Sequence, residues 1–211
     1  MRLPQGVSRR DGDGAVAVGE QPLTTEAARP PRAGVLRHLF PWWAVVAPWL
    51  VSRVLSIGVM LAAIHDPFRG GRFTQLVLKW DGAYYVGIAR TGYGPVDVRF
   101  PRWAFFPGLP GVIRVLRELG NDEVLVFALN QLVFLVALAG VYRIAQRYGS
   151  PRAALLAVWA LALFPASFVF SMTYASSLFL AASVWAFVLV EEHHRPSCDV
   201  WAGVLAAGAA L

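Results

Sequence analysis

Long apolar runs separated by short polar loops dominate the chain after residue 38. The first run covers residues 40–64, and a helix needs about 20 apolar residues to cross a bilayer. Later runs predict further spans at 124–142, 153–172 and 176–190, followed by a partial span at 200–211. The pattern therefore predicts an all-α, polytopic bundle of transmembrane helices.

Two other regions depart from this pattern. Residues 65–103 form a polar loop rich in aromatic side chains. Residues 104–119 are apolar but short and interrupted by prolines, which favours an interfacial or re-entrant segment. Residues 1–38 are rich in Gly, Pro and Arg and lack apolar periodicity, so we expect a disordered tail. The chain thus divides into this tail and a transmembrane domain at 39–211.

Composition and charge support a membrane protein. Hydrophobic residues make up 57% of the chain, above the about 45–50% of soluble domains. The net charge is +6, but the basic residues lie in the tail and loops, as the positive-inside rule explains. We therefore expect no nucleic-acid partner. Arg29, Arg32 and Arg37 precede the first span, which predicts a cytoplasmic tail and a loop 65–103 on the opposite side.

Within this loop, the spacing of residues predicts a short helix at 80–89. Asp81, Tyr84, Tyr85 and Ile88 fall on one helical face, and Gly92 ends the helix. Aromatic residues on one side suit a helix lying in the membrane interface. Asp81 is also a favoured N-cap residue, so helix capping is an alternative to a chemical role.

Polar residues within the predicted spans need partners. Arg53 either faces a polar partner or cavity or extends to the near interface. For Asn130 and Gln131 we expect hydrogen bonds between helices. The Glu-Glu-His-His run at 191–194 looks like a solvated helix end, since adjacent histidines do not point at one metal. We expect no metal and no cofactor.

Three ordered motifs give the chain a family resemblance. They are WDGAYYVGIARTGYG at 80–94 (the first motif), AFFPGLP at 104–110 (the second motif) and FPASFVFSMTYASSLF at 164–179 (the third motif). Together they resemble the PIG-V-like mannosyltransferases, multi-span glycosyltransferases of the GT-C class related to the second mannosyltransferase of GPI-anchor assembly. The resemblance implies a GT-C fold of which this chain is the N-terminal half, truncated at its C-terminus.

The resemblance also implies a reaction. These enzymes move mannose from polyprenyl-phosphate mannose to a hydroxyl group, with inversion, at the outer surface of the membrane. It implies Asp81 as general base, a glycan, lipid or protein acceptor, contacts with membrane lipids, and a location in a bacterial cell membrane. The substrate-binding residues expected from the motifs and their surroundings are Trp80, Tyr84, Tyr85, Tyr93, Arg90, Arg102, Phe106 and Tyr174.

One departure from the family pattern supports a second hypothesis. Ala175 and Ser176 stand where the family has Ser or Thr followed by Glu. The alternative is therefore a non-catalytic relative, such as a lipid-binding or assembly subunit. Asp66 and Asp97 are rival carboxylates in the loop, its arginines also suit lipid headgroups, and its aromatics also suit interfacial anchors.

Overall fold

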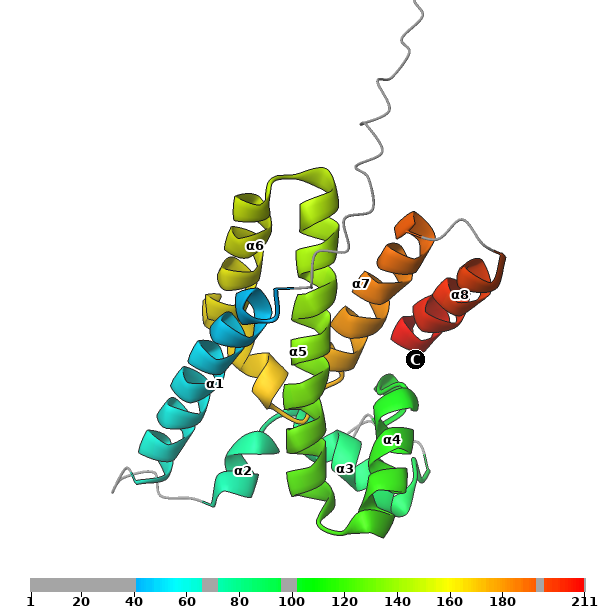
Figure 1. The fold of residues 1–211 in the computed structure, drawn as a ribbon. Helices are drawn as coiled ribbons and strands as arrows, with labels where there is room; N and C mark the ends of the chain where they lie inside the picture. The colour runs from blue at the N-terminus through cyan, green and yellow to red at the C-terminus, as the bar shows by residue number, and fades with distance from the viewer. Residues whose placement is uncertain (1–40, 66–71, 96–101, 193–195, 211) are drawn as a thin grey trace, which may run out of the picture. The chain divides into compact units, whose positions relative to one another are not determined.

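A long central helix, α5 (Asp122–Tyr148), organises the structure, a computed structural model that describes residues 41–65, 72–95, 102–192 and 196–210 (Figure 1). The described residues form α-helices and 3-10 helices and contain no strand. This confirms the predicted all-α fold. The predicted tail at 1–38 lies outside the described residues.

The remaining elements connect and surround α5. The other α-helices are α1 (Trp43–Ile64), α2 (Phe73–Val77), α3 (Asp81–Thr91), α4 (Gly108–Leu116), α6 (Pro151–Leu163), α7 (Ser176–Glu192) and α8 (Pro196–Ala210). Three 3-10 helices connect them: η1 (Arg102–Ala104), η2 (Arg117–Leu119) and η3 (Pro165–Ser171).

Helix α5 packs against α1, α4, α6 and α7, and α8 packs against α7. One core cluster joins Phe134 and Leu138 of α5 to Val45 of α1 and Val158 of α6. A second cluster lies at the other end of α5, where α3 and α4 pack together, and it contains Ile113. Figure 1 shows α3 and α4 beside the lower end of α5, so the first two motifs sit at one end of the bundle.

Local sequence explains how the helices begin and end. The side chain of Asn121 accepts hydrogen bonds from the first amides of α5, and Ser150 caps α6 in the same way, with Pro151 as the first helical residue. Such caps satisfy amides that have no partner within the helix. Gly92 ends α3 as predicted, with φ 76°, a conformation that glycine adopts without steric cost.

The predicted span at 153–172 is interrupted. Helix α6 ends at Leu163, and η3 continues at an angle of 74° to it. Pro165 lacks an amide hydrogen and disfavours helical geometry at Phe164, whose ψ is 134°. The two pieces together are long and apolar enough for one broken span or a re-entrant loop.

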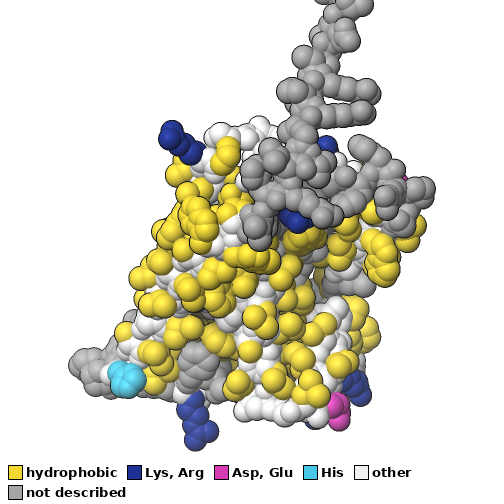
Figure 2. Space-filling view, in the orientation of Figure 1, with side chains coloured by type: hydrophobic (Ala, Val, Ile, Leu, Met, Phe, Trp, Pro, Cys, Tyr) yellow, Lys and Arg dark blue, Asp and Glu magenta, His cyan; other side chains and the backbone are white. Residues whose placement is uncertain are grey.

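By length and composition, α1 and residues 123–148 of α5 are each able to cross a membrane. The helices α7 and α8 are shorter apolar helices, so the predicted spans at 176–190 and 200–211 stay predictions. Helix α4 has nine residues and reaches about 14 Å, less than the bilayer core. Figure 2 shows hydrophobic side chains over the middle of the visible face and charged ones toward its ends.

The polar residues of the spans are buried. Arg53 is 4% exposed and donates to the side-chain oxygen of Gln131 at 3.2 Å, so it has the expected polar partner, and the alternative of reaching the interface is wrong. For Asn130 the sequence predicts a hydrogen bond to another helix. It donates instead to the backbone oxygen of Met172 at 2.6 Å, because the segment after η3 passes beside α5.

The crossing of α5 and α7 depends on a glycine. A Cβ atom at Gly140 would lie 2.6 Å from Cγ1 of Val184, whereas one at Gly58 would meet nothing within 4 Å. Overpacking costs about 1–3 kcal/mol, and replacing helical glycine by alanine gains about 1 kcal/mol. We predict that Gly140→Ala lowers the free energy of unfolding by up to about 2 kcal/mol. Gly58→Ala, the control, does not lower it; unfolding in detergent measures both.

Candidate functional site

The first motif opens on a strained turn. Trp80 has φ 55° and ψ −120°, and it is the only non-glycine residue with positive φ in the described part of the chain. Trp80 occupies the N-cap position of α3 without a side-chain capping bond, and Asp81 is the first helical residue. The alternative of Asp81 as N-cap is therefore wrong. Its carboxylate lies exposed in the first turn, where the helix dipole favours negative charge.

The third motif holds this turn in place. The amide of Thr173 donates to the backbone oxygen of Val77 at 3.1 Å, and the hydroxyl of Tyr174 donates to the backbone oxygen of Lys79 at 3.2 Å. A Cβ atom at Gly82 would lie 3.1 Å from the oxygen of Val77 and 3.3 Å from Cβ of Thr173. Glycine therefore permits the close approach of the two segments, which brings Tyr174 beside Asp81.

Two tyrosines respond to the charge of Asp81. Burial raises the pKa of Tyr85 above its usual value, and the negative charge of Asp81 raises it further. Burial also raises the pKa of Tyr174, with a further contribution from Asp81. Both phenols thus stay protonated and able to donate hydrogen bonds.

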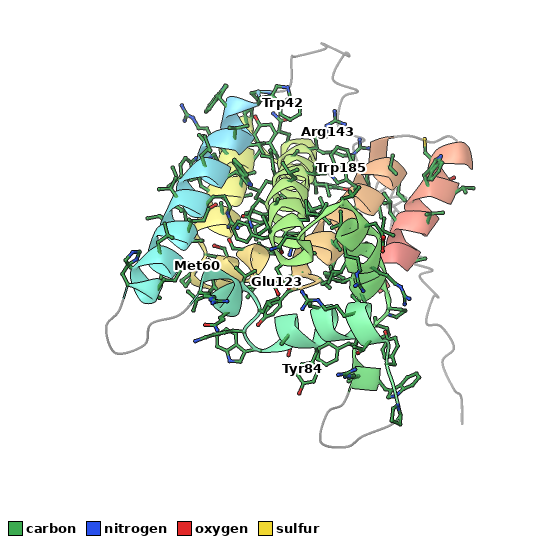
Figure 3. The ribbon with its side chains drawn as sticks, turned by 90° about the horizontal axis from the view of Figure 1, so that it is seen from below. Trp42, Met60, Tyr84, Glu123, Arg143 and Trp185 are labelled. Atoms are coloured by element: carbon green, nitrogen blue, oxygen red, sulfur yellow. The ribbon has the colours of Figure 1, made fainter. Side chains whose placement is uncertain are left out.

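The second motif covers one side of α3 with aromatic rings. Phe105 stacks on Tyr84 with ring centres 5.0 Å apart and meets Tyr85 edge-on at 5.1 Å. The hydroxyl of Tyr93 donates to the backbone oxygen of Phe105 at 2.8 Å, and its ring stacks on Trp103 at 4.9 Å. Figure 3 shows Tyr84 projecting from α3 away from the bundle. On the predicted aromatic face of α3, Tyr84 and Tyr85 therefore pack against Phe105, while part of the face remains exposed to solvent.

The arginines lie toward the other end of α3. Arg90 forms an ion pair with Glu123 at 3.1 Å. Arg102 donates to the hydroxyl of Thr91 at 2.8 Å and to the backbone oxygen of Gly92 at 3.2 Å. These contacts tie α3 to α5 and to η1. Phe106 is 65% exposed. Arg99, Asp66 and Asp97 lie outside the described residues.

An apolar groove of about 390 Å³ runs between α1 and η3, and we call it the α1–η3 groove. Met60, labelled in Figure 3, lines it from α1, and Phe168 lines it from η3. Lys79 and Trp80 line it as well, so the groove reaches the turn that carries Asp81. Sequence reasoning missed this groove. The signal was the small residue Ser56, with Ser52 and Ala63 at helical spacing on the same face of α1.

The acidic and histidine residues form no metal site among those described: no group of three His, Cys, Asp or Glu is placed to hold an ion. His193 and His194 lie outside the described residues.

The long apolar helices indicate an integral membrane protein, and the groove that reaches a polar turn is its candidate site. Residues 107–211 match a family model described as dolichyl-phosphate-mannose-protein mannosyltransferase. The match relates this part of the chain to membrane mannosyltransferases, and the helical structure is consistent with part of a GT-C fold. The matched region contains the third motif and begins after Asp81. No curated protein and no solved structure matches the chain.

The electrostatic link between Asp81 and the two tyrosines is testable. We predict that Asp81→Asn lowers the pKa values of Tyr85 and Tyr174 toward the usual 10.0, because a negative charge that opposes phenolate formation is removed. The near-ultraviolet absorbance of tyrosinate during an alkaline titration measures the change. Glu118→Gln removes an exposed carboxylate elsewhere and serves as control. Identical titration curves for Asp81→Asn and the wild type would contradict the prediction.

Proposed function

We propose that the protein is a membrane mannosyltransferase that moves mannose from polyprenyl-phosphate mannose to a hydroxyl group of a glycan, lipid or protein acceptor. The observation that carries the proposal is the exposed Asp81 on a turn that also lines the α1–η3 groove. A lipid-linked sugar needs this combination, since its chain stays in an apolar environment while its sugar reaches a polar site.

The α1–η3 groove supports the proposed donor. Apolar side chains such as Val59 and Phe168 line it and suit a polyprenyl chain. Lys79 supplies a positive charge to the same groove, and an ammonium group binds phosphate as a point charge. The donor phosphate would lie near Lys79, and the sugar beyond it toward Asp81.

Asp81 is the proposed general base. In this mechanism its carboxylate accepts the proton of the acceptor hydroxyl as the hydroxyl oxygen attacks the anomeric carbon. The bond from that carbon to the phosphate oxygen breaks, and polyprenyl phosphate leaves with the electron pair. Attack from the face opposite the leaving group inverts the configuration. Exposure of Asp81 supports this role, because a base must reach the acceptor.

The aromatic residues around Asp81 are proposed to bind the sugar and acceptor. Trp80 is 67% exposed, and Tyr84 and Tyr85 lie on the same helix one turn after Asp81; such rings stack on sugar faces. Tyr93 and Phe106 extend this surface. Arg90 and Arg102, placed at the far end of α3, are proposed to face acceptor or lipid phosphates at the outer side of a bacterial cell membrane.

A second candidate function follows from Ser176, which begins α7 where PIG-V-like enzymes carry glutamate. In this alternative the groove binds a polyprenyl phosphate without transferring its sugar. The finer relationship to the PIG-V-like enzymes and to GPI-anchor assembly is likewise part of the proposal. Transfer in the first experiment below favours the enzyme, whereas binding of polyprenyl phosphate without transfer favours the alternative.

We predict that Asp81→Asn lowers kcat by about 10²–10⁴, because asparagine keeps the size of the side chain but does not accept the proton. Sugar transfer from polyprenyl-phosphate mannose in membranes measures this loss. Glu118→Gln should transfer like the wild type. Equal rates for Asp81→Asn and the wild type would eliminate Asp81 as the base.

The groove is tested separately on α1. We predict that Ser56→Phe raises KM for the polyprenyl donor by about tenfold, since overpacking costs about 1–3 kcal/mol. The matched control is Val54→Phe, because Val54 is 69% exposed and does not line the groove. An unchanged KM in Ser56→Phe would place the donor elsewhere.

A further inference from the structure

We infer that Arg53 and Asn130, buried within the predicted spans, are positioning residues that hold the turn carrying Asp81. They act through residues 165–175, which we call the η3–α7 link. The inference rests on the proposed function only for what the turn does; the mechanical connection stands on the contacts themselves.

Arg53 binds the link from α1. Its Nη1 atom donates to Oγ of Ser171 at 2.6 Å and to Oε1 of Gln131 at 3.2 Å, and Nη2 donates to the backbone oxygen of Ser167 at 3.5 Å. Its guanidinium lies 4.6 Å from the ring centre of Phe134. All these partners are neutral. A buried cation of this kind costs free energy within a membrane, so an apolar residue would serve simple helix packing better.

Asn130 binds the same link from α5. Its Nδ2 atom donates to the backbone oxygens of Met172 at 2.6 Å and Tyr174 at 3.4 Å. Its Oδ1 atom and Oγ1 of Thr173 are buried and have no hydrogen-bond partner among the described residues. Leaving such atoms unpaired costs about 1–3 kcal/mol each. The asparagine thus satisfies two backbone oxygens of the link at a cost to overall stability.

The link in turn holds the turn at Trp80. Residues Thr173 and Tyr174 bond to the backbone oxygens of Val77 and Lys79. A positive φ at a residue other than glycine persists only where its surroundings enforce it. These two bonds hold the residues just before Trp80. Release of the link would let Trp80 relax and would move Asp81, the next residue.

Amide hydrogen exchange tests this connection in the whole chain, reconstituted in lipid nanodiscs without substrate. We expect Arg53→Met and Asn130→Leu to speed exchange of the amides at 77–85 by about fivefold to tenfold, the effect of losing one hydrogen bond. Arg53→Lys, which keeps the charge, should restore part of the protection. The control is Trp185→Phe, which removes the bond from Nε1 of Trp185 to the backbone oxygen of Val136, another contact between α7 and α5.

The exchange of residues 132–139 in α5 separates positioning from general loss of stability. Faster exchange at 77–85 with slow exchange in α5 supports the inference. Unchanged exchange at 77–85 overturns it, and so does equal acceleration at 77–85 and at 132–139 in α5. Acceleration at 77–85 in Trp185→Phe equal to that in Asn130→Leu also overturns it. If Arg53→Met does not fold, Tyr174→Phe and Asn130→Leu decide the question, since Tyr174→Phe removes only a hydroxyl group.

Sugar transfer provides the second readout. If the network acts through Asp81, Asn130→Leu lowers transfer in the wild-type background and has no further effect when combined with Asp81→Asn. An equal additional loss in the combined variant overturns action through Asp81. Absence of transfer by the wild type defeats the proposed function alone, because hydrogen exchange still decides whether the network holds the turn.

Discussion

The η3–α7 link depends on hydrogen bonds made inside an otherwise apolar bundle. Because Pro165 ends α6, the residues that follow lose regular helical hydrogen bonding. Backbone groups in such surroundings must find partners within the protein. Arg53 of α1, Asn130 of α5 and Val77 at the end of α2 supply those partners. The irregular backbone of the link thus provides the partners for Arg53 and Asn130, two polar residues of otherwise apolar helices.

The same link also forms part of the candidate site. Ser167, Phe168 and Met172 line the α1–η3 groove, while Thr173 and Tyr174 bind the turn before Asp81. One part of the link therefore lines the groove proposed for the donor lipid, and its C-terminal end contacts the turn that precedes the proposed base. The groove and the turn that carries Asp81 thus share the η3–α7 link as a common support.

The region that matches the family model contacts the part of the chain that carries Asp81. The matched region begins at Pro107 and therefore leaves out the first motif with Asp81. The structure joins the two parts of the chain, because Tyr174 in the matched region bonds to the backbone oxygen of Lys79, the residue just before the first motif. Phe105, just before the matched region, packs on Tyr84 of α3. The region that matches the mannosyltransferase family model therefore lies next to the turn that carries Asp81.

Hydropathy, caps and breakers act over short distances, so the local pattern predicts α1, α5 and the end of α3 at Gly92. The break at Pro165 is also a local effect of proline, although the hydropathy of residues 153–172 predicts one continuous span. The partners of Arg53 and Asn130, the α1–η3 groove and the strained conformation of Trp80 depend instead on contacts between distant segments. The bond from Tyr174 to Lys79 joins residues far apart in the chain. Such contacts depend on how the helices pack, and a local sequence pattern does not predict that packing.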